Sequence, residues 1–191
     1  MKKIILASGS PRRKEVLENV GLDFTVVTSD YEEDMTLDME PAKLAEYLSL
    51  GKAKDVAKGY ADAIVIAADT FVTLDHHRLG KPATNDVARS TLQTISGQTI
   101  DVITGYTIID TATTKTVTKS VITQVVMKEI TEAEITRYIK TGEPSDKAGA
   151  FGIQGYGALL VKEIHGDYYN VMGLPLFSLT QSLKEFGIKL L

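Results

Sequence analysis

The sequence predicts an α/β protein, because segments with strand and helix patterns follow one another along its 191 residues. The apolar run ending at Ala7 has strand length, and a Ser-Gly-Ser turn then leads into a helical pattern that begins at Pro11. A second run, Ala63–Ala68, is apolar throughout and rich in β-branched residues, as expected of a strand buried on both faces. The order of these segments agrees with an α/β fold but does not determine how the sheet is arranged.

The first strand-to-helix turn is a candidate anion site. Pro11 suits the first helical position and Ser10 suits the N-cap before it, so free backbone N–H groups and the positive end of the helix dipole point outward. Arg12 and Arg13 add two guanidinium groups, and phosphate is the simple ligand that this combination favours. The alternative is an exposed basic first turn, although cations at a helix N-terminus oppose the dipole.

Phe24–Val27 predicts a second strand, and an acidic segment follows it. Such a run is most often a solvated loop. If the first turn binds phosphate groups, however, a divalent cation held by hard oxygen ligands is also expected. The acidic residues of the segment are Asp30, Glu32, Glu33, Asp34 and Asp38.

A helix is expected from Pro41 to about Lys58, and one lysine lies within its apolar stripe. Leu44, Leu48 and Val56 are close to one face, and Lys52 is four residues from both Leu48 and Val56. The lysine either extends its charged end to the surface or reaches a cleft and meets an anion there.

Asp69 and Thr70 follow the buried run and are expected at its C-terminal end. Ligands bind at that edge in open α/β sheets. A carboxylate at this place could instead cap a nearby backbone group. Phe71–Lys81 then predicts a hairpin-like excursion.

Two adjacent histidines in this excursion, His76 and His77, suggest a metal site. Neighbours in a strand point to opposite faces and no clear third ligand is nearby, so we interpret them as turn residues. Lys81, between Gly80 and Pro82, is the better phosphate candidate.

The remainder of the chain predicts three helices, three strands and one long loop, with no repeat or linker that would divide a single domain of residues 1–191. The loop, Glu143–Gly157, offers the polar side chains of Asp146, Lys147 and Gln154. The expected elements are a helix over Asn85–Ile95, strands over Thr99–Asp110 and Thr116–Lys128, a helix from the capping box Thr131–Glu134 to Gly142, a strand over Ala158–Ile164, and a final helix from Pro175 to about Phe186.

The composition excludes several classes of protein. The chain has no cysteine, so it has no disulfide, thiolate metal site or cysteine nucleophile, and its net charge of −4 gives no support to a nucleic-acid-coating role. No segment approaches the roughly 20 apolar residues of a membrane span, so we expect a cytoplasmic protein without a membrane partner. A Walker loop and a serine–histidine elbow are also missing, which argues against P-loop enzymes and acyl hydrolases.

Motifs along essentially the whole chain resemble, in order, those of the Maf family of nucleoside triphosphate pyrophosphatases. The resemblance implies a Maf/ITPase-like fold, in which a twisted mixed sheet with flanking helices is divided into two lobes by the active-site cleft. The motifs are Ser8-x-Ser10-Pro11-Arg12-Arg13, Ala68-Asp69-Thr70, Leu79-Gly80-Lys81-Pro82, Ser96-Gly97 with Thr104-Gly105, the stretch from Asp146 to Gly155, and the stretch from Asp167 to Pro175.

The same resemblance implies hydrolysis between the α and β phosphates of a nucleoside triphosphate, which gives a monophosphate and pyrophosphate. It places a functional lysine at Lys52 and a functional acid at Glu33 or its neighbour Glu32, of which we favour Glu33.

The implied reaction needs an aligned water molecule and a neutralised leaving group. Asp69 is the candidate for orienting the water or accepting its proton, directly or as a metal ligand, and Glu33 would help to hold Mg²⁺ or Mn²⁺. The residues expected to bind the phosphates or stabilise the leaving group are Ser8, Ser10, Arg12, Arg13, Lys52, Lys81 and Lys147.

The chain further resembles the subgroup that acts on dTTP and UTP, with Arg12, Thr70 and Gln154 at its specificity positions. An arginine directed at O4 would accept thymine or uracil, whereas a glutamine amide could flip to serve cytosine as well. A second hypothesis is a nucleotide-binding regulator, since the family is also associated with arrest of septum formation and cell division. Asp69 beside a strand end favours the enzyme, and the candidate assembly is a homodimer.

Overall fold

A computed structural model describes residues 2–34 and 37–190, so that residues 1, 35, 36 and 191 of the expected 1–191 domain lie outside the described residues. Within them, one seven-stranded sheet has the order β2-β1-β3-β5-β6-β7, with β4 paired to β3. β1 is parallel to β2 and β3, and the other pairs are antiparallel, so the sheet is mixed, as expected. The strands are β1 Lys3–Leu6, β2 Thr25–Val26, β3 Ala63–Leu74, β4 His77–Leu79, β5 Thr99–Asp110, β6 Thr116–Met127 and β7 Val161–His165.

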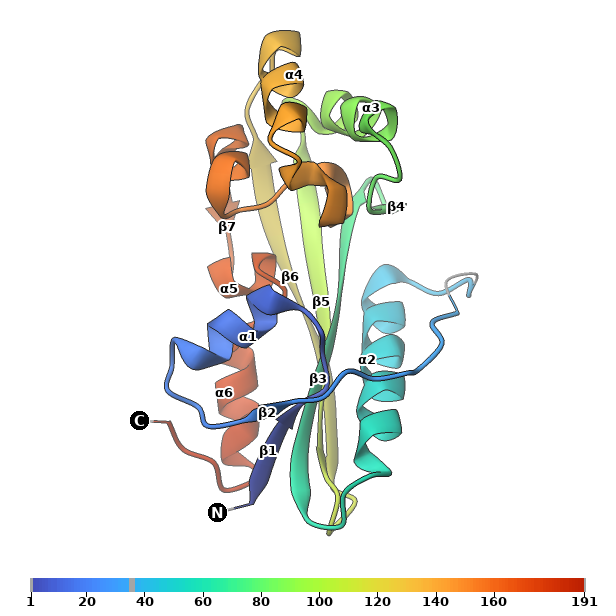
Figure 1. Ribbon diagram of the computed structural model, residues 1–191, viewed down its shortest axis with the longest axis vertical. Coiled ribbons are helices and arrows are strands. Elements are labelled where there is room, and N and C mark those ends of the chain that lie inside the picture. The colour runs from blue at the N-terminus through green and yellow to red at the C-terminus, as the bar shows by residue number, and fades with distance from the viewer. Residues whose placement is uncertain (1, 35–36, 191) are drawn as a thin grey trace.

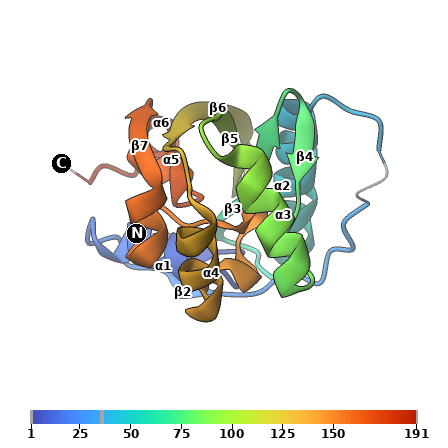
Figure 2. The ribbon, with the colours of Figure 1, turned by 90° about the horizontal axis from the view of Figure 1, so that it is seen from above.

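Helices cover both faces of this sheet and one of its ends. α1 and α6 lie on one face, α2 lies on the opposite face, and α3 and α4 pack beside the far ends of the long strands (Figures 1 and 2). The helices are α1 Pro11–Glu18, α2 Pro41–Ala57, α3 Asn85–Ile95, α4 Glu132–Lys140, α5 Tyr168–Val171 and α6 Leu176–Lys184, with 3-10 helices η1 Glu143–Asp146, η2 Ala148–Ala150 and η3 Gly155–Leu160.

The hydrophobic core is divided into two lobes, which β3, β5 and β6 join by running through both (Figure 1). In the lobe that holds the N-terminus, Ile64 and Ile66 pack with α1 and α6, and Val65 and Ala67 pack with α2 on the other face. In the other lobe, Val72 packs with α3 and α4. The expected two-lobed α/β architecture is therefore confirmed.

Local sequence signals account for most helix ends. The Ser10 side chain accepts a hydrogen bond from the Arg13 amide at 3.5 Å and caps α1, and the expected capping box of Thr131 and Glu134 starts α4. Two short elements depart from the sequence prediction. α5 was not predicted, and it begins where the Asp167 carboxylate accepts from two backbone amides.

The strand expected over Ala158–Ile164 begins only at Val161, because the preceding residues form η3. The carboxylate of Glu143 accepts hydrogen bonds from the amides of Tyr156 and Gly157, both at 2.9 Å, and so holds the start of η3 out of the sheet. The second strand covers Thr25–Val26 only, and the final helix begins at Leu176 with Pro175 as its N-cap.

The expectation that Asp69 and Thr70 mark the end of a strand is wrong, since both lie in the middle of β3. What ends there is the neighbouring strand. β1 pairs with β3 only as far as Ile66, and β4 pairs with the same edge only from Val72. Among the described residues, the edge of β3 between these two points has no strand partner, and Asp69 lies within that gap.

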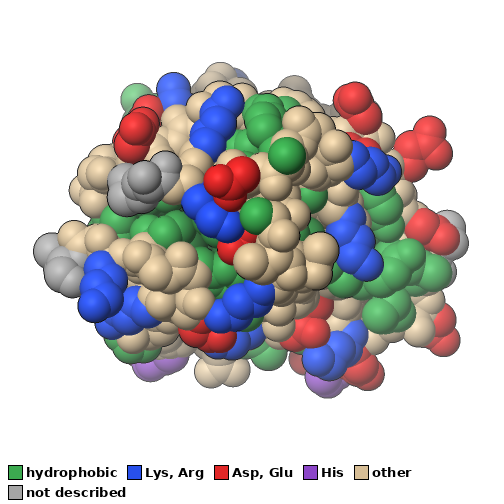
Figure 3. All heavy atoms as spheres, turned by 90° about the horizontal axis from the view of Figure 1, so that it is seen from below, with side chains coloured by type: hydrophobic (Ala, Val, Ile, Leu, Met, Phe, Trp, Pro, Cys, Tyr) green, Lys and Arg blue, Asp and Glu red, His purple; other side chains and the backbone are tan. Residues whose placement is uncertain are grey.

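Charged side chains of both signs are interspersed on the molecular face seen in Figure 3. Among the described residues, none of the helices is both long enough and apolar enough to cross a membrane.

Candidate active site

A cleft of about 740 Å³ opens where the edge of β3 is unpaired. Segments from both lobes line it, including the β1–α1 turn, α2, β3, the β4 hairpin and the loop that carries η1 and η2. Every site residue expected from the sequence lines this one cleft: Ser8, Ser10, Arg12, Arg13, Glu33, Lys52, Asp69, Thr70, Lys81, Lys147 and Gln154.

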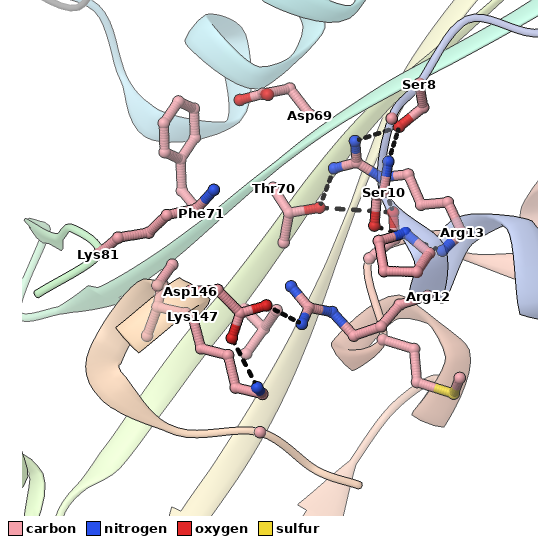
Figure 4. A pocket seen from close by; sticks show the side chains of 18 of the residues that line it. Ser8, Ser10, Arg12, Arg13, Asp69, Thr70, Phe71, Lys81, Asp146 and Lys147 are labelled. Atoms are coloured by element: carbon pink, nitrogen blue, oxygen red, sulfur yellow. Dashed lines mark hydrogen bonds and ion pairs between the residues drawn. The ribbon is translucent and has the colours of Figure 1, made fainter. Parts of the chain in front are cut away.

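The side chains of Asp69 and Thr70 enter the cleft on opposite faces of the sheet. Successive side chains of a strand point to opposite faces. Thr70 therefore lies on the side of α1, and Asp69 lies on the side of α2. In Figure 4 the two side chains accordingly extend to different sides of the β3 ribbon.

On the α1 side, the guanidinium of Arg13 is held by three oxygens that carry no charge. It donates to the backbone carbonyl of Gly173 at 2.8 Å, to Thr70 Oγ1 at 2.9 Å and to Ser8 Oγ at 3.2 Å (Figure 4). Burial lowers the pKa of Arg13, and the nearby Asp69 carboxylate opposes that shift, but an arginine keeps its proton in proteins. Arg13 therefore holds a fixed positive charge whose hydrogen-bond partners do not neutralise it.

Thr70 itself is held in this group by further contacts. Its hydroxyl lies 3.0 Å from Thr104 Oγ1 and 3.4 Å from the Gly173 carbonyl. Thr70 thus holds the Arg13 guanidinium through a hydroxyl that is itself held, and its role in base specificity stays a prediction.

On the α2 side, Lys52 brings two carboxylates together. Its Nζ lies 2.5 Å from Asp69 Oδ1 and 2.8 Å from Glu33 Oε1, with only 14% of the lysine side chain exposed. Of the two alternatives for Lys52, the structure shows the one in which it reaches the cleft and meets anions.

A close approach of α2 to the sheet makes this pair possible. Gly105 of β5 is the register partner of Asp69, and a Cβ added there would lie 2.2 Å from the backbone carbon of Ala45 in α2. Any larger residue would push the helix away. Lys52 is two helical turns further along α2, so Gly105 indirectly sets its distance from Asp69.

A second charged group bridges α1 and the η1 loop. Asp146 lies 3.3 Å from Arg12 Nη1 through Oδ2, and 2.7 Å from Lys147 Nζ through Oδ1 (Figure 4). These cations, Lys147 first, hold the pKa of Asp146 below its ordinary value. Lys147 also donates to the Glu143 carbonyl at 2.8 Å, so its position is well defined.

The remaining expected residues lie at the rim of the cleft. Gln154 donates through Nε2 to Glu15 Oε1 at 2.9 Å, which ties the η2–η3 loop to α1. Lys81 is exposed beyond β4 and, in Figure 4, extends beside Phe71. His76 lies in the hairpin turn with φ of 67°, as expected, whereas His77 is the first residue of β4.

The cleft lining also includes residues that the sequence analysis did not single out, among them Tyr31, Phe71 and Arg78. Arg78 Cζ lies 5.7 Å from the centre of the Phe71 ring, a cation–π geometry at the wall of the cleft. The position of Phe71 directly after Asp69-Thr70 in one strand is the signal that could have found it. Tyr31 gave no signal, because its importance depends on where α2 packs.

The cleft can hold an anion with several charges together with a cation. Glu33 and Asp69 already converge on one ammonium group, and carboxylate oxygens are ligands that Mg²⁺ prefers. No cluster of three or more potential metal-ligating side chains occurs in the described part of the chain. The donor set thus fits a metal that takes its other ligands from water and from substrate phosphates.

Known proteins are similar to this chain over nearly its full length. Residues 3–186 match the family described as Maf-like protein. A dTTP/UTP pyrophosphatase from one strain of Bacillus cereus is 50% identical over 188 residues, which are 98% of this chain and 92% of that protein. The protein of the same name from a second Bacillus cereus strain is 48% identical over 188 residues, covering 98% of this chain and 97% of its own length.

Among solved structures, that of the Staphylococcus aureus Ham1 protein is similar with a TM-score of 0.46 and 13% identity, over 67% of this chain and 73% of that one. This similarity is too low to support an argument about fold or function.

Proposed function

Since this chain belongs to the Maf family, we propose that it is a nucleoside triphosphate pyrophosphatase. Its proposed substrates are dTTP and UTP, which it hydrolyses to the monophosphate and pyrophosphate as a nucleotide-pool housekeeping activity. The relatives named dTTP/UTP pyrophosphatase support the substrate class. The observation that carries the proposal is the single cleft that holds both Arg13, whose three hydrogen-bond acceptors carry no charge, and the Lys52–Asp69–Glu33 cluster.

Asp69 is the proposed general base or water-orienting group. Its Oδ1 lies 2.5 Å from Lys52 Nζ, and this ion pair fixes the orientation of the carboxylate. The side chain lies at the gap in the edge of β3, where a water molecule and a phosphate group can both approach it.

The cations of the cleft are proposed to neutralise the pyrophosphate leaving group. Lys52 donates to Asp69 and forms an ion pair with Glu33, and an ammonium group with three N–H donors can also donate to a phosphate oxygen. Arg13 supplies charge from the opposite side of β3. Lys81 and Lys147, at the rim and on the loop, extend this positive surface toward the other lobe.

A divalent cation, Mg²⁺ or Mn²⁺, would be held by Glu33 and Asp69 together with the substrate, and it would supply further neutralisation of phosphate charge. In this proposal Lys52 keeps the two carboxylates at the right separation before the nucleotide arrives.

The base is proposed to be selected by Arg12 of α1 and Gln154 of the η2–η3 loop, which both line the cleft. An arginine only donates hydrogen bonds, so it matches O4 of thymine or uracil and not the N4 amine of cytosine. The ion pair of Arg12 with Asp146 orients this donor in the free protein.

The proposal is tested by incubating the protein with a panel of nucleoside triphosphates and Mg²⁺ or Mn²⁺, with products resolved by chromatography. We expect dTTP and UTP to be cleaved best, CTP less well and purine nucleotides poorly, and EDTA to abolish cleavage. Release of diphosphate and orthophosphate would contradict the proposed cleavage site, and full activity in EDTA would contradict the metal.

The alternative of a nucleotide-binding regulator is not favoured, since the relatives are named as pyrophosphatases. A homodimer and a cytoplasmic location stay predictions from the sequence.

A further inference from the structure

The segment that carries Glu33 has little regular structure of its own, yet its carboxylate lies 2.8 Å from Lys52. Residues 29–34 lie between β2 and α2 and form neither helix nor strand. Something outside the segment must therefore determine where Glu33 stands.

One face of α2 carries the contacts that hold this segment. Tyr47, Gly51 and Asp55 are spaced four residues apart and so follow one another along the same side of the helix. At one end, the Asp55 carboxylate accepts hydrogen bonds from Ser29 Oγ and from the Asp30 amide, both at 3.0 Å. At the other end, the neighbouring Tyr47 raises the pKa of Tyr31.

Between these two ends, the ring of Tyr31 lies directly on Gly51. A Cβ added to Gly51 would be 2.4 Å from Cζ, 2.5 Å from Cε1 and 2.7 Å from Cε2 of that ring. These distances are too short for any side chain, so only glycine allows the ring to lie there.

Gly51 is in the interior of α2, where glycine is less favourable than alanine. Its presence is explained if the ring must lie against the helix backbone. Tyr31 also packs against the cluster that contains Leu44, Leu48 and Phe71.

We propose that Tyr31 is a positioning residue, whose ring, seated on Gly51 between Tyr47 and Asp55, holds Glu33 against Lys52. Glu33 is two residues beyond Tyr31, and Lys52 is the residue after Gly51. The contact between Tyr31 and Gly51 is therefore next to the ion pair of Glu33 and Lys52. The predicted effect on catalysis rests on the proposed pyrophosphatase reaction. The packing of the Tyr31 ring on Gly51 is a property of the protein without substrate and does not depend on that reaction.

The test compares Gly51→Ala, Tyr31→Ala, the double variant and Tyr31→Phe, with Lys54→Ala as the control at an exposed position of α2. Hydrogen–deuterium exchange of residues 29–34, the melting temperature, and kcat and KM for dTTP are measured for each variant. Exchange reports the hydrogen bonds of this segment directly and does not depend on activity.

We expect Gly51→Ala to keep or raise the melting temperature, to speed exchange in residues 29–34, and to lower kcat by up to about 10²-fold, as small misplacements of catalytic groups do. Tyr31→Ala should act in the same way, and the double variant should be no worse than either single variant, since both remove one contact. Tyr31→Phe keeps the ring and should retain most of the activity, and Lys54→Ala should behave like the unaltered protein.

Unchanged exchange and kcat in both Gly51→Ala and Tyr31→Ala, or effects that add in the double variant, would overturn the inference. If the unaltered protein releases no pyrophosphate, the proposed function fails. The exchange data still decide whether the contact of Tyr31 with Gly51 holds residues 29–34 in place.

Discussion

The substitution Asp69→Asn tests the chemistry of the cleft with the least disturbance to its shape. The two side chains are nearly isosteric, and an asparagine oxygen can still accept a hydrogen bond from Lys52 at the position of Oδ1, which lies 2.5 Å from Nζ. What is lost is the negative charge, and with it the capacity to take a proton from water. Lys52 keeps Glu33 as a charged partner.

Asp69→Asn is expected to lower the unfolding free energy only slightly and to lower turnover strongly. Lys52 stays charged in the variant, so an ion pair is exchanged for a hydrogen bond from a charged group to a neutral oxygen; such bonds contribute roughly 1.5–3 kcal/mol, and the variant should lose about 1 kcal/mol of unfolding free energy within that range. In a chain of this size that loss lowers the melting temperature by about 2–4 °C. Loss of a general base slows turnover by about 10²–10⁴-fold, or about 2.7–5.5 kcal/mol of activation free energy.

The assay measures pyrophosphate release from dTTP and thermal unfolding of the same preparations. A matched control is Asp110→Asn, because Asp110 also pairs with a lysine, Lys2, at 2.6 Å, and its side chain is 12% exposed against 11% for Asp69. Asp110 lies at the far end of β5, outside the cleft lining. Both variants should lose similar stability, and only Asp69→Asn should lose turnover. Wild-type turnover in Asp69→Asn would refute the reasoning.

Two further predictions concern base selection and acid stability. Arg12→Ala should lower the ratio of kcat/KM for dTTP to kcat/KM for CTP by about 5- to 150-fold, since an unpaired buried polar group costs roughly 1–3 kcal/mol. Gln154→Ala should lower this ratio less. An equal effect of Arg12→Ala on both nucleotides would instead assign the arginine to phosphate alone. The hydrogen bond from Lys128 lowers the pKa of Glu134 from 4.5 to about 2, so its stabilisation is complete above pH 4.5 and is lost as the pH falls toward 2. The melting temperature should therefore fall more steeply over this range in the unaltered protein than in Glu134→Gln, and parallel curves would contradict this assignment.

Features encoded by neighbouring residues could be predicted from the sequence. The start of α1 follows from Ser10 and Pro11, and the start of α4 follows from the capping box at Thr131, because a cap is made by residues within one turn. The length of β3 could not be predicted in this way. Asp69 interrupts the apolar pattern, and its place in mid-strand makes sense only once the end of β1 leaves that edge of the sheet open.

The residues of the site were identified from motifs, but most of their partners were not. The sequence presents Lys52 as a lysine within an apolar stripe and gives no sign of Asp69, 17 residues away, as its partner. The pairing of Arg12 with Asp146 joins residues 134 positions apart. Such contacts depend on how elements far apart in the sequence pack together. Gly105 is an example, because α2 can approach the sheet so closely only where this residue has no side chain.

The central claim is that water attacks the α-phosphorus of a pyrimidine nucleoside triphosphate bound in this cleft. The most direct measurement is hydrolysis of dTTP with Mg²⁺ in ¹⁸O-labelled water, followed by mass spectrometry of the products. We predict thymidine monophosphate and pyrophosphate in equal amounts, with the label in the monophosphate. Label in the pyrophosphate, or formation of the diphosphate and orthophosphate, would contradict the proposed reaction.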